Sequence, residues 1–460
     1  MRRCRPNVGN ALQSAARRRA PWRADARAIT DRTRGAFPLK PGARAVWAWA
    51  LFDFANSPFT TIVVTFVYST YFTQAIVTDP IHGTVLWSRA VTLSAIVVAV
   101  VSPVLGSVAD VAGWRRPLLL GTTAVCVAAT AALYEVLPGE VSRALALFVV
   151  ANIAFELANV FYNAVLPEIA APQRIGRVSG LGWGLGYVGG LLSLVVALVT
   201  LVRPETPWFG FTTEQGQNVR ATTLLAALWF AVFSVPIFLW TGHPARPPAP
   251  ARRAVARAVD DIRLTLRRIG AYRQIVRLLI ARLVYNDGLV TVFAFGAIYA
   301  AETFGFSLTE VLVFGIVLNV AAGIGSFAMG YADDRLGGKR TILISLAGLI
   351  VATFVAVVAV SKAWLWVAGV LIGIFVGPNQ SASRSLMARF IPRGAESKFF
   401  GFYAFSGKLT AFAGPLLLGL LTQSTGSQRA GIAVVLLMFV VGFVLLLLVD
   451  EDEGVAAAHR

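Results

Sequence analysis

The residues of this sequence that could do chemistry are acids and amides set inside apolar stretches. The stretch from Trp47 to Phe72 is long enough to cross a bilayer as one helix, yet it contains Asp53. Asn56, Ser57 and Thr60 follow Asp53 at spacings of three, four and seven, so the four side chains share one helical face. A carboxylate at membrane depth costs about 2.5–3.5 kcal/mol on insertion scales and by default faces a polar cavity. The pattern predicts a polar path for a solute or for protons.

Two further segments place polar groups at the same depth. Asn286 and Asp287 lie in a second membrane-length stretch near the middle of the chain. A third stretch carries a stripe at spacings of four, seven and eleven, formed by Asn152, Glu156, Asn159 and Asn163. Such a stripe lines a cavity or joins two helices through hydrogen bonds, and we expect the cavity.

Arg384 and Lys408 are predicted to be the cations deepest in their spans. Arg384 follows Asn379 and Gln380, and its planar guanidinium could hold a substrate carboxylate in a fork or neutralise Asp287. Both interpretations stay open.

Permanent ion pairs are the alternative to a path for the deep acids. Lys408 is the candidate partner of Asp53, and Arg282 is a second candidate partner of Asp287. Arg277 and Arg282 lie in the first turns of their span, so we expect both to snorkel to the interface. A partly dehydrated carboxyl can also change protonation as a cavity opens to either side, so proton coupling through Asp53, Glu156 or Asp287 is a hypothesis.

Composition places these groups in a membrane protein. The chain has 460 residues, of which 57% are hydrophobic and only 14% charged, and its mean hydropathy is +0.70. About 25% charged residues is usual in soluble domains. Two cysteines cannot make a disulfide framework, and the three histidines fall in expected loops or at the terminus, so we expect no metal site. No phosphate-binding loop and no Ser/His/Asp constellation is present, so we expect no cofactor and no enzyme.

Apolar spans of about 20 residues recur along the sequence. Twelve are expected, centred near Val63, Val98, Val127, Phe155, Leu191, Phe230, Phe293, Gly323, Val351, Gly373, Ala411 and Leu437. Basic residues gather at the N-terminus and in the even-numbered loops, which predicts that both termini are cytoplasmic. This placement accounts for the net charge of +18 without nucleic acid. The fold class predicted is an all-α membrane protein with two six-helix bundles.

Five regions follow from this pattern. Residues 1–45 are a basic segment, predicted as a disordered cytoplasmic tail, with an anionic-lipid anchor or an extension from a misassigned start as alternatives. The bundles are expected at 46–240 and 274–449, and a short cytoplasmic tail at 450–460. The linker 241–273 has apolar residues at helical spacing among arginines, which favours an amphipathic helix on the membrane surface, with a solvated linker as the alternative.

The two bundles contain matching loop motifs. Gly106-Ser-Val-Ala-Asp110-Val-Ala-Gly113-Trp-Arg115-Arg116 aligns with Gly330-Tyr-Ala-Asp-Asp334-Arg-Leu-Gly337-Gly-Lys339-Arg340 at a single offset. An acid at such a place can meet an arginine and a helix N-terminus of the opposing bundle. The loops resemble the conserved cytoplasmic motif of the major facilitator superfamily, and this resemblance implies a cytoplasmic latch built from Asp110, Arg115, Arg116, Asp334, Lys339 and Arg340, formed when the protein faces outward.

These motifs carry a resemblance to a known family. The two loops resemble the conserved cytoplasmic motif of the major facilitator superfamily, with departures at Val108, Val111, Ala332 and Asp333. The segments WALFDFANS, YNAVLPE, SGLGWG, YNDG, GPNQ and SASRSLMAR narrow the resemblance to its vacuole-effluxer branch, the autophagy-related permeases. The resemblance covers Val46 to Val449 and implies a transporter, and its eukaryotic members imply efflux of neutral amino acids.

We therefore predict a secondary active transporter that exports a small polar solute, a neutral amino acid first, by alternating access and with proton coupling. The expected setting is a multi-pass monomer in a prokaryotic plasma membrane, with the lipid bilayer, the solute and protons as its partners. A multidrug exporter of the same fold is one alternative. A membrane receptor or lipid scramblase that transports no solute is another.

Overall fold

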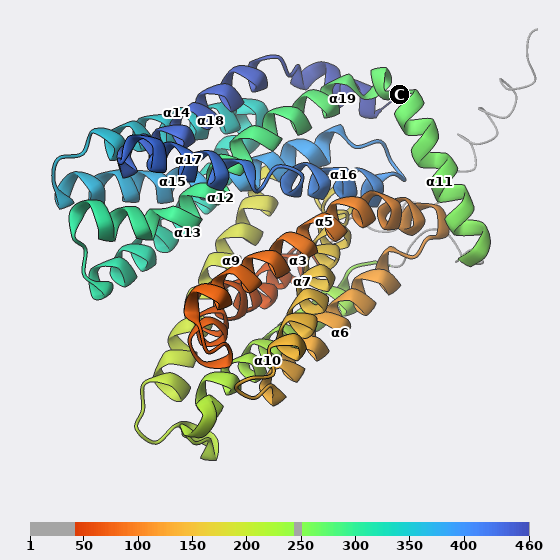
Figure 1. Cartoon of the computed structure of the whole chain (residues 1–460). Coiled ribbons are helices and arrows are strands. Elements are labelled where there is room, and N and C mark those ends of the chain that lie inside the picture. Colours follow the sequence, from red (N-terminus) through yellow and green to blue (C-terminus); the bar gives the residue numbers. More distant parts are fainter. Residues whose placement is uncertain (1–41, 243–250, 460) are drawn as a thin grey trace, which may run out of the picture. The chain divides into compact units, whose positions relative to one another are not determined.

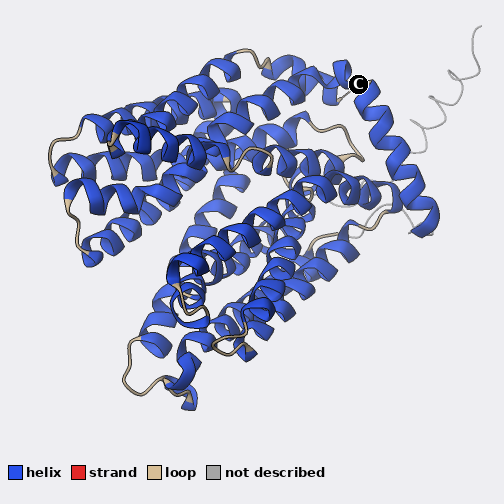
Figure 2. Cartoon of the chain, viewed as in Figure 1, coloured by secondary structure: helices blue, strands red, loops and turns tan. Residues whose placement is uncertain are grey.

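All regular structure in the described residues is helical. The computed structural model describes residues 42–242 and 251–459, and within these ranges every regular element is a helix (Figure 1; Figure 2). Twelve helical segments there are long and apolar enough to cross a membrane, which confirms the predicted fold class. The expected basic tail lies, up to residue 41, outside the described residues, as do residues 243–250 of the linker.

The helices divide into a first half, Ala43–Trp240, and a second half, Arg273–Ala458. The first half contains α3 (Ala43–Pro58), α4 (Tyr68–Tyr71), α5 (Pro80–Ala112), α6 (Arg115–Ala132), α7 (Val141–Asn163), α8 (Leu166–Ile169), α9 (Ile175–Ala197) and α10 (Gln217–Trp240). Its π-helical segments are Phe59–Phe66, Phe72–Ile76 and Leu198–Val202, and its 3-10 turns are Leu133–Glu135, Trp208–Gly210 and Glu214–Gly216.

The linker helix α11 (Ala251–Arg267) and a 3-10 turn at Ile269–Tyr272 lead into the second half. That half contains α12 (Arg273–Phe304), α13 (Leu308–Leu336), α14 (Gly338–Val358), α15 (Lys362–Phe390), α16 (Glu396–Lys408), α17 (Ala413–Thr425), α18 (Gln428–Leu447) and α19 (Glu451–Ala458). Residues 450–460, predicted as a tail, are therefore mostly the helix α19.

The first span is a broken helix rather than the single α-helix predicted. Pro58 has no N–H to donate to the carbonyl of Phe54, and the indole Nε1 of Trp229 on α10 donates to that carbonyl instead, at 3.2 Å. The hydroxyl of Ser57 donates to the carbonyl of Asp53, and that of Thr60 to the carbonyl of Ser57. Beyond Pro58 the chain continues as a π-helical segment, a form common at functional sites.

Glycines let the two halves approach each other closely. A β-carbon at Gly106 of α5 would lie closer than 3.0 Å to the backbone of α16. A β-carbon at Gly401 of α16 would likewise lie closer than 3.0 Å to the backbone of α5. Gly180 of α9 lies in the same way against the backbone of α13. Gly180 is thus a packing residue of the kind that lets helices approach closely in membranes.

The joint between the halves lies toward one end of the helices, which we call the motif end. It is the end where α5 and α13 finish, and where α9 and α16 begin. Two of the contacts between the halves that lie farthest from this end are the hydrogen bond of Tyr187 and the ion pair of Lys408. These residues lie twelve residues after the starts of α9 and α16, Ile175 and Glu396. Among the described residues, no hydrogen bond between the halves is found more than about 20 Å along the helices from the motif end.

Candidate functional site

Two ion pairs join the halves at membrane depth. Arg384 of α15 donates to Asp53 of α3 at 2.9 Å, and Lys408 of α16 pairs with Glu156 of α7 at 2.6 Å. Both acids come from the first half and both cations from the second. The alternative in which Lys408 pairs with Asp53 is therefore wrong, because Lys408 pairs with Glu156.

Arg384 is surrounded by partners. Its Nε donates to the hydroxyl of Ser179 at 2.9 Å, and Nη2 to the carbonyl of the same residue at 2.7 Å. Its Nη1 also reaches Asn163 at 3.3 Å, and its guanidinium lies over the ring of Trp49 at 4.7 Å. Gly182 of α9 leaves room for this pair, since a β-carbon there would lie 2.6 Å from the Asp53 carboxylate.

The two ion pairs differ in burial. The side chains of Arg384 and Asp53 are 4% and 13% exposed, whereas those of Lys408 and Glu156 are 30% and 21% exposed. Removing one partner of a buried pair typically costs 3–5 kcal/mol because the other charge is left uncompensated. The Arg384–Asp53 pair is thus suited to holding the halves together, and the Glu156–Lys408 pair is the more accessible to a solute or proton.

Asp287 lies apart from both pairs. Its Oδ2 accepts a hydrogen bond from the amide of Gly414, in the first turn of α17, at 3.0 Å, and the residue is only 3% exposed. Its Oδ1 is buried without a hydrogen-bond partner among the described residues. Neither Arg282 nor Arg384 forms an ion pair with Asp287, so the alternative in which one of them neutralises it is wrong.

Arg282 does not snorkel to the interface. Its Nη1 donates to the carbonyl of Tyr403 at 2.9 Å and to the hydroxyl of Ser406 at 3.0 Å. Its Nη2 reaches Asn286 at 3.4 Å, and the guanidinium lies 3.6 Å from the centre of the Tyr403 ring. Arg277 does reach the end of the span, where it donates to the carbonyl of Leu448. Sequence reasoning missed the contacts of Arg282 because it could not show that Tyr403 and Ser406 of α16 lie beside it.

The amides predicted for the path have different environments. Asn56 donates to Asn159 at 3.1 Å, so these two tie α3 to α7. Asn286 donates to the carbonyl of Gly407 at 3.3 Å. Gln380 accepts a hydrogen bond across the halves from the hydroxyl of Tyr187 at 3.0 Å.

Two other amides are buried. Asn152 is 9% exposed, and Asn379 is fully buried, with its amide donating to Ser345 of α14 at 3.0 Å. Asn379 therefore does not line a path in this conformation, contrary to the prediction.

Asp110 and Asp334 meet the opposing half at the motif end. Asp110 accepts hydrogen bonds from the amides of Ser397 and Lys398, in the first turn of α16, at 3.0 and 2.8 Å. Asp334 accepts one from the amide of Gly176 at 2.8 Å and pairs with the side chain of Arg177 on α9. A carboxylate at a helix N-terminus is stabilised by the unpaired amides and the helix dipole. The predicted contacts are present in both copies, and their role as a latch stays a prediction.

Only one of the four basic residues predicted for the latch bridges the halves. Arg115 pairs with Asp110 at 3.2 Å, with Glu396 of the second half at 2.8 Å, and with Glu168. Arg116, by contrast, donates to the carbonyl of Phe238, and Lys339 to that of Leu447, each within its own half. The exposed Arg340 makes no hydrogen bond or ion pair with any described residue. Arg116, Lys339 and Arg340 are therefore removed from the predicted latch.

The linker helix α11 also reaches this joint. Asp261 accepts from the hydroxyl of Ser107 on α5 and from the ammonium of Lys398 on α16, both at 2.9 Å. The predicted helix is thus present, and one of its faces is docked on protein. Exposed apolar side chains remain on it, among them Val255 and Leu266.

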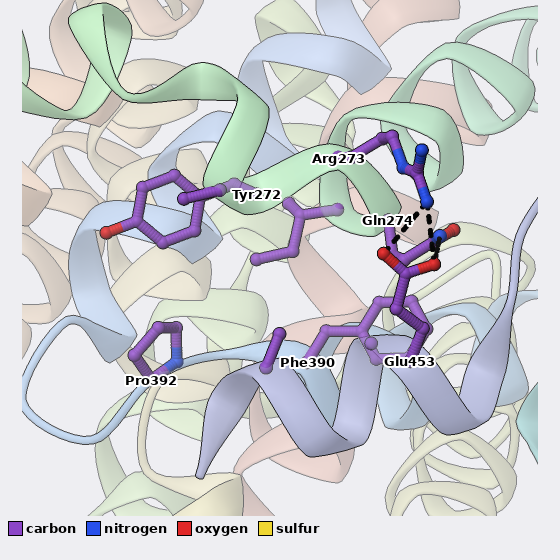
Figure 3. Close-up of a pocket in the computed structure, with 10 residues that line it drawn as sticks. Tyr272, Arg273, Gln274, Phe390, Pro392 and Glu453 are labelled. Carbon is purple, nitrogen blue, oxygen red and sulfur yellow. Dashed lines mark hydrogen bonds and ion pairs between the residues drawn. The ribbon is translucent and has the colours of Figure 1, made fainter. Parts of the chain in front are cut away.

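The C-terminal helix α19 packs on the second half. Glu451 accepts hydrogen bonds from the amides of Gly338 and Lys339, both at 2.9 Å, at the start of α14. Glu453 pairs with Arg273 at 2.9 Å and accepts from Gln274 at 2.6 Å, beside a small pocket (Figure 3). The hydrogen bonds from Arg273 and Gln274 hold the pKa of Glu453 below its usual range. Sequence reasoning did not assign these contacts, although three acids in the first turn signal a helix start.

The fold and the charged joint define a multi-pass membrane transporter. Solved structures with this fold include the proton:xylose symporter XylE, with a TM-score of 0.70, 13% identity, and coverage of 89% of this chain and 96% of that chain. A bacterial homologue of the iron transporter ferroportin, in an outward-facing state, gives a TM-score of 0.64 at 14% identity over 89% of this chain and 99% of that chain.

The comparisons by sequence narrow the class. The family model for vacuole effluxer Atg22-like proteins matches residues 81–459, and the chain belongs to that family. The MFS-type transporter YxiO of Bacillus subtilis, which is uncharacterized, is 26% identical over 417 residues, with 90% of this chain and 96% of YxiO covered.

Fungal relatives match over a shorter part. Autophagy-related protein 22 of Cryptococcus neoformans is 28% identical over 300 residues, with 60% of this chain covered. The matched region spans about half the length of that relative. YxiO is named as a transporter of the MFS type, which is not an enzymatic class.

Proposed function

We propose that this chain is a secondary active transporter that exports a small polar solute, a neutral amino acid first, by alternating access. The observation that carries the proposal is the pair of ionic contacts between the halves, Asp53–Arg384 and Glu156–Lys408. Each draws its acid from one half and its cation from the other. Alternating access requires contacts between the halves that can be exchanged for contacts with a solute.

The closed motif end supports an outward-facing state. With the motif end in the cytoplasm, as the distribution of arginines and lysines favours, both termini are cytoplasmic. The hydrogen bonds of Asp110 and Asp334 then close the inner side, and among the described residues no hydrogen bond joins the halves toward the outer side. Opening the inner side requires those bonds to break. The side chains of Asp110 and Asp334 are only 4% and 1% exposed, so breaking their bonds costs more than the about 0–1 kcal/mol that an exposed ion pair is worth.

Glu156 is the carboxylate we assign to proton coupling. It is more exposed than Asp53 and, unlike Asp287, it has a direct cationic partner across the halves. Protonation of Glu156 would release Lys408 and weaken the contact between the halves. A charge released in this way changes which conformation is favoured, which is what coupling requires.

The test is transport by the purified protein in vesicles with an imposed proton gradient. Labelled leucine and tyrosine should move in the wild type and not in Asp53→Asn, because Arg384 would lose its counter-charge. Glu156→Gln should still exchange amino acid across the membrane but should no longer accumulate it in response to the gradient. If no amino acid moves under any gradient, the substrate proposed is wrong. Lipid flipping without a gradient would instead favour a scramblase.

A further inference from the structure

Arg282 is an arginine inside a membrane span. It lies nine residues after the start of α12, which is about 14 Å along the helix, and it is half-buried. Charged groups at such depth are expensive, and they are kept where they pair or bind something. We therefore ask which group balances the positive charge of Arg282.

The neighbouring deep cations both have carboxylate partners, and Arg282 has none. Arg384 has Asp53 at 2.9 Å, and Lys408 has Glu156 at 2.6 Å. Within residues 42–242 and 251–459, no carboxylate oxygen lies within 4.0 Å of a nitrogen of Arg282. The nearest acid in sequence, Asp287, is bound to the amide of Gly414.

The protein compensates Arg282 only in part. Its guanidinium and the amide of Asn286 bind carbonyls of Tyr403 and Gly407 in the last turns of α16, where the helix ends before α17. The C-terminus of a helix is equivalent to roughly half a negative charge. About half of the positive charge therefore has no counterpart in the described protein.

Arg282 also keeps donors free. A guanidinium has five N–H groups. Nη1 uses two of them on Tyr403 and Ser406, and Nη2 uses one on Asn286 at the long distance of 3.4 Å. The Nε–H and the second Nη2–H have no acceptor among the described residues. The Tyr403 ring, 3.6 Å away, supports the guanidinium from one face and leaves its edge to a ligand.

The site adjoins the accessible ion pair. A β-carbon at Gly407 would lie 2.8 Å from Nη1 of Arg282, so the guanidinium rests on the residue that precedes Lys408. Lys408 in turn pairs with Glu156. Arg282 thus lies without a carboxylate partner among the described residues, next to the Lys408–Glu156 ion pair, which a ligand could exchange. This arrangement suits a ligand with a carboxylate at one end and an ammonium at the other.

We propose that Arg282 binds the carboxylate of the transported solute. The proposal rests on the proposed transport function and adds to it the chemical class of the substrate, a small monocarboxylate. The carboxylate takes the free edge of the guanidinium in two hydrogen bonds. In a zwitterion, the ammonium group meets Glu156 in place of Lys408.

The test compares three probes of one shape on the purified full chain: L-leucine, 4-methylpentanoate, which lacks the amine, and L-leucinamide, which lacks the carboxylate. Binding is measured by the shift in thermal unfolding midpoint and by competition with labelled leucine. The variants are Arg282→Gln and Arg282→Lys. Arg277→Gln is the matched control, since Arg277 is on the same helix and binds only the carbonyl of Leu448.

We expect leucine and 4-methylpentanoate to stabilise the wild type and Arg277→Gln, and leucinamide to stabilise neither. Arg282→Gln should weaken leucine binding at least tenfold. Arg282→Lys should give an intermediate affinity, because an ammonium keeps the positive charge but cannot make the two parallel hydrogen bonds of a guanidinium. If Arg282→Gln does not fold, Arg282→Lys and the contrast between leucine and leucinamide on the wild type decide the outcome.

We call the proposed binding of the solute carboxylate by Arg282 the anchor. Failure of the anchor and failure of the proposed function give different results. Equal leucine binding by the wild type and Arg282→Gln overturns the anchor and leaves amino-acid transport intact. Binding of 4-methylpentanoate, lactate or pyruvate through Arg282, with no amino acid bound, keeps the anchor and overturns the amino-acid substrate. If no amino acid and none of these monocarboxylates binds the wild type, the inference is wrong.

Discussion

The two copies of the loop motif place the same acid against the same kind of helix end, yet they balance their charges differently. In the first copy, Arg115 of the loop faces Glu168, which lies four residues before Pro172. In the second copy, Lys339 takes the place of Arg115, and Arg389 lies three residues before Pro392. One copy thus pairs a base with an acid where the other has two bases.

The second copy obtains its missing acids from other places. Arg389 pairs with Asp333 at 2.6 Å and lies 3.7 Å from Glu451 of α19. Asp333 and Glu451 belong to the same half as Arg389. In the first copy, Arg115 pairs with Glu396 of the opposite half. The first network therefore spans the joint between the halves, whereas the second mainly holds one half together and crosses the joint through Arg177 and the amide of Gly176.

The largest effect should come from Arg389→Gln. Its removal leaves Asp333 buried at 2% exposure without a counter-charge, which costs about 3–5 kcal/mol of folding stability. Arg115→Gln should cost less, because Glu168 is half-exposed and Asp110 keeps two amide hydrogen bonds. Thermal unfolding in detergent measures both. The double variant Arg389→Gln/Asp333→Asn should recover much of the loss, and an absence of recovery would contradict the assignment of the cost to Asp333.

Gly106→Ala should weaken the joint itself. A β-carbon there meets the backbone of Ser397, and overpacking of this kind typically costs about 1–3 kcal/mol. The counterpart Gly330→Ala should be milder, since its nearest atoms are 3.1 Å away. Spin labels on the exposed Arg174 and Arg335 should show a longer distance at the motif end in Gly106→Ala. Equal distances in the two variants would show that the two joints are alike.

Glu451→Gln should affect the second copy alone. The amides of Gly338 and Lys339 would lose a charged acceptor, a kind of bond worth about 1.5–3 kcal/mol. Asp452→Asn, on an exposed neighbour, is the control and should leave the unfolding midpoint unchanged. The label distance at the motif end should stay as in the wild type, because the change lies within one half.

The smallest effect should come from Glu453→Gln. Its ion pair with Arg273 is exposed, and the lowered pKa of Glu453 means that the contact stabilises the fold above the usual glutamate range of about 4.3. That contribution is lost as pH falls through the lowered pKa. The difference in unfolding midpoint between wild type and variant should therefore be small at pH 7 and should shrink as the pH falls below the usual glutamate range. A difference that grows on acidification would have the wrong sign.

The sequence predicted the elements better than their partners. Hydropathy predicts the twelve spans, since apolar length is a local property, and the loop motif predicted the helix ends that Asp110 and Asp334 meet. The partner of Lys408 was wrong because hydropathy gives the depth of a residue and not the rotation of its helix. Asp53 and Glu156 lie at similar depth, and only the packed helices show which of them Lys408 reaches.

Arg282 shows the same limit. A span centred at Phe293 places Arg282 near its edge, where a cation is expected to snorkel, and hydropathy does not show that the carbonyl of Tyr403 lies beside it. Glu451 could not be assigned for a different reason. Its partners at the start of α14 lie more than 110 residues away, and no local pattern connects them.

The hydrogen bond from Trp229 to the carbonyl left free by Pro58 has a mechanical consequence. A main-chain acceptor inside a bilayer that loses its donor has no water to replace it, so breaking this bond is costly. In the alternating access that we propose, the sixth span would therefore move together with the first. A reporter attached near the outer part of either span would then follow both, and sliding of one helix along the other would have to break the bond from the indole.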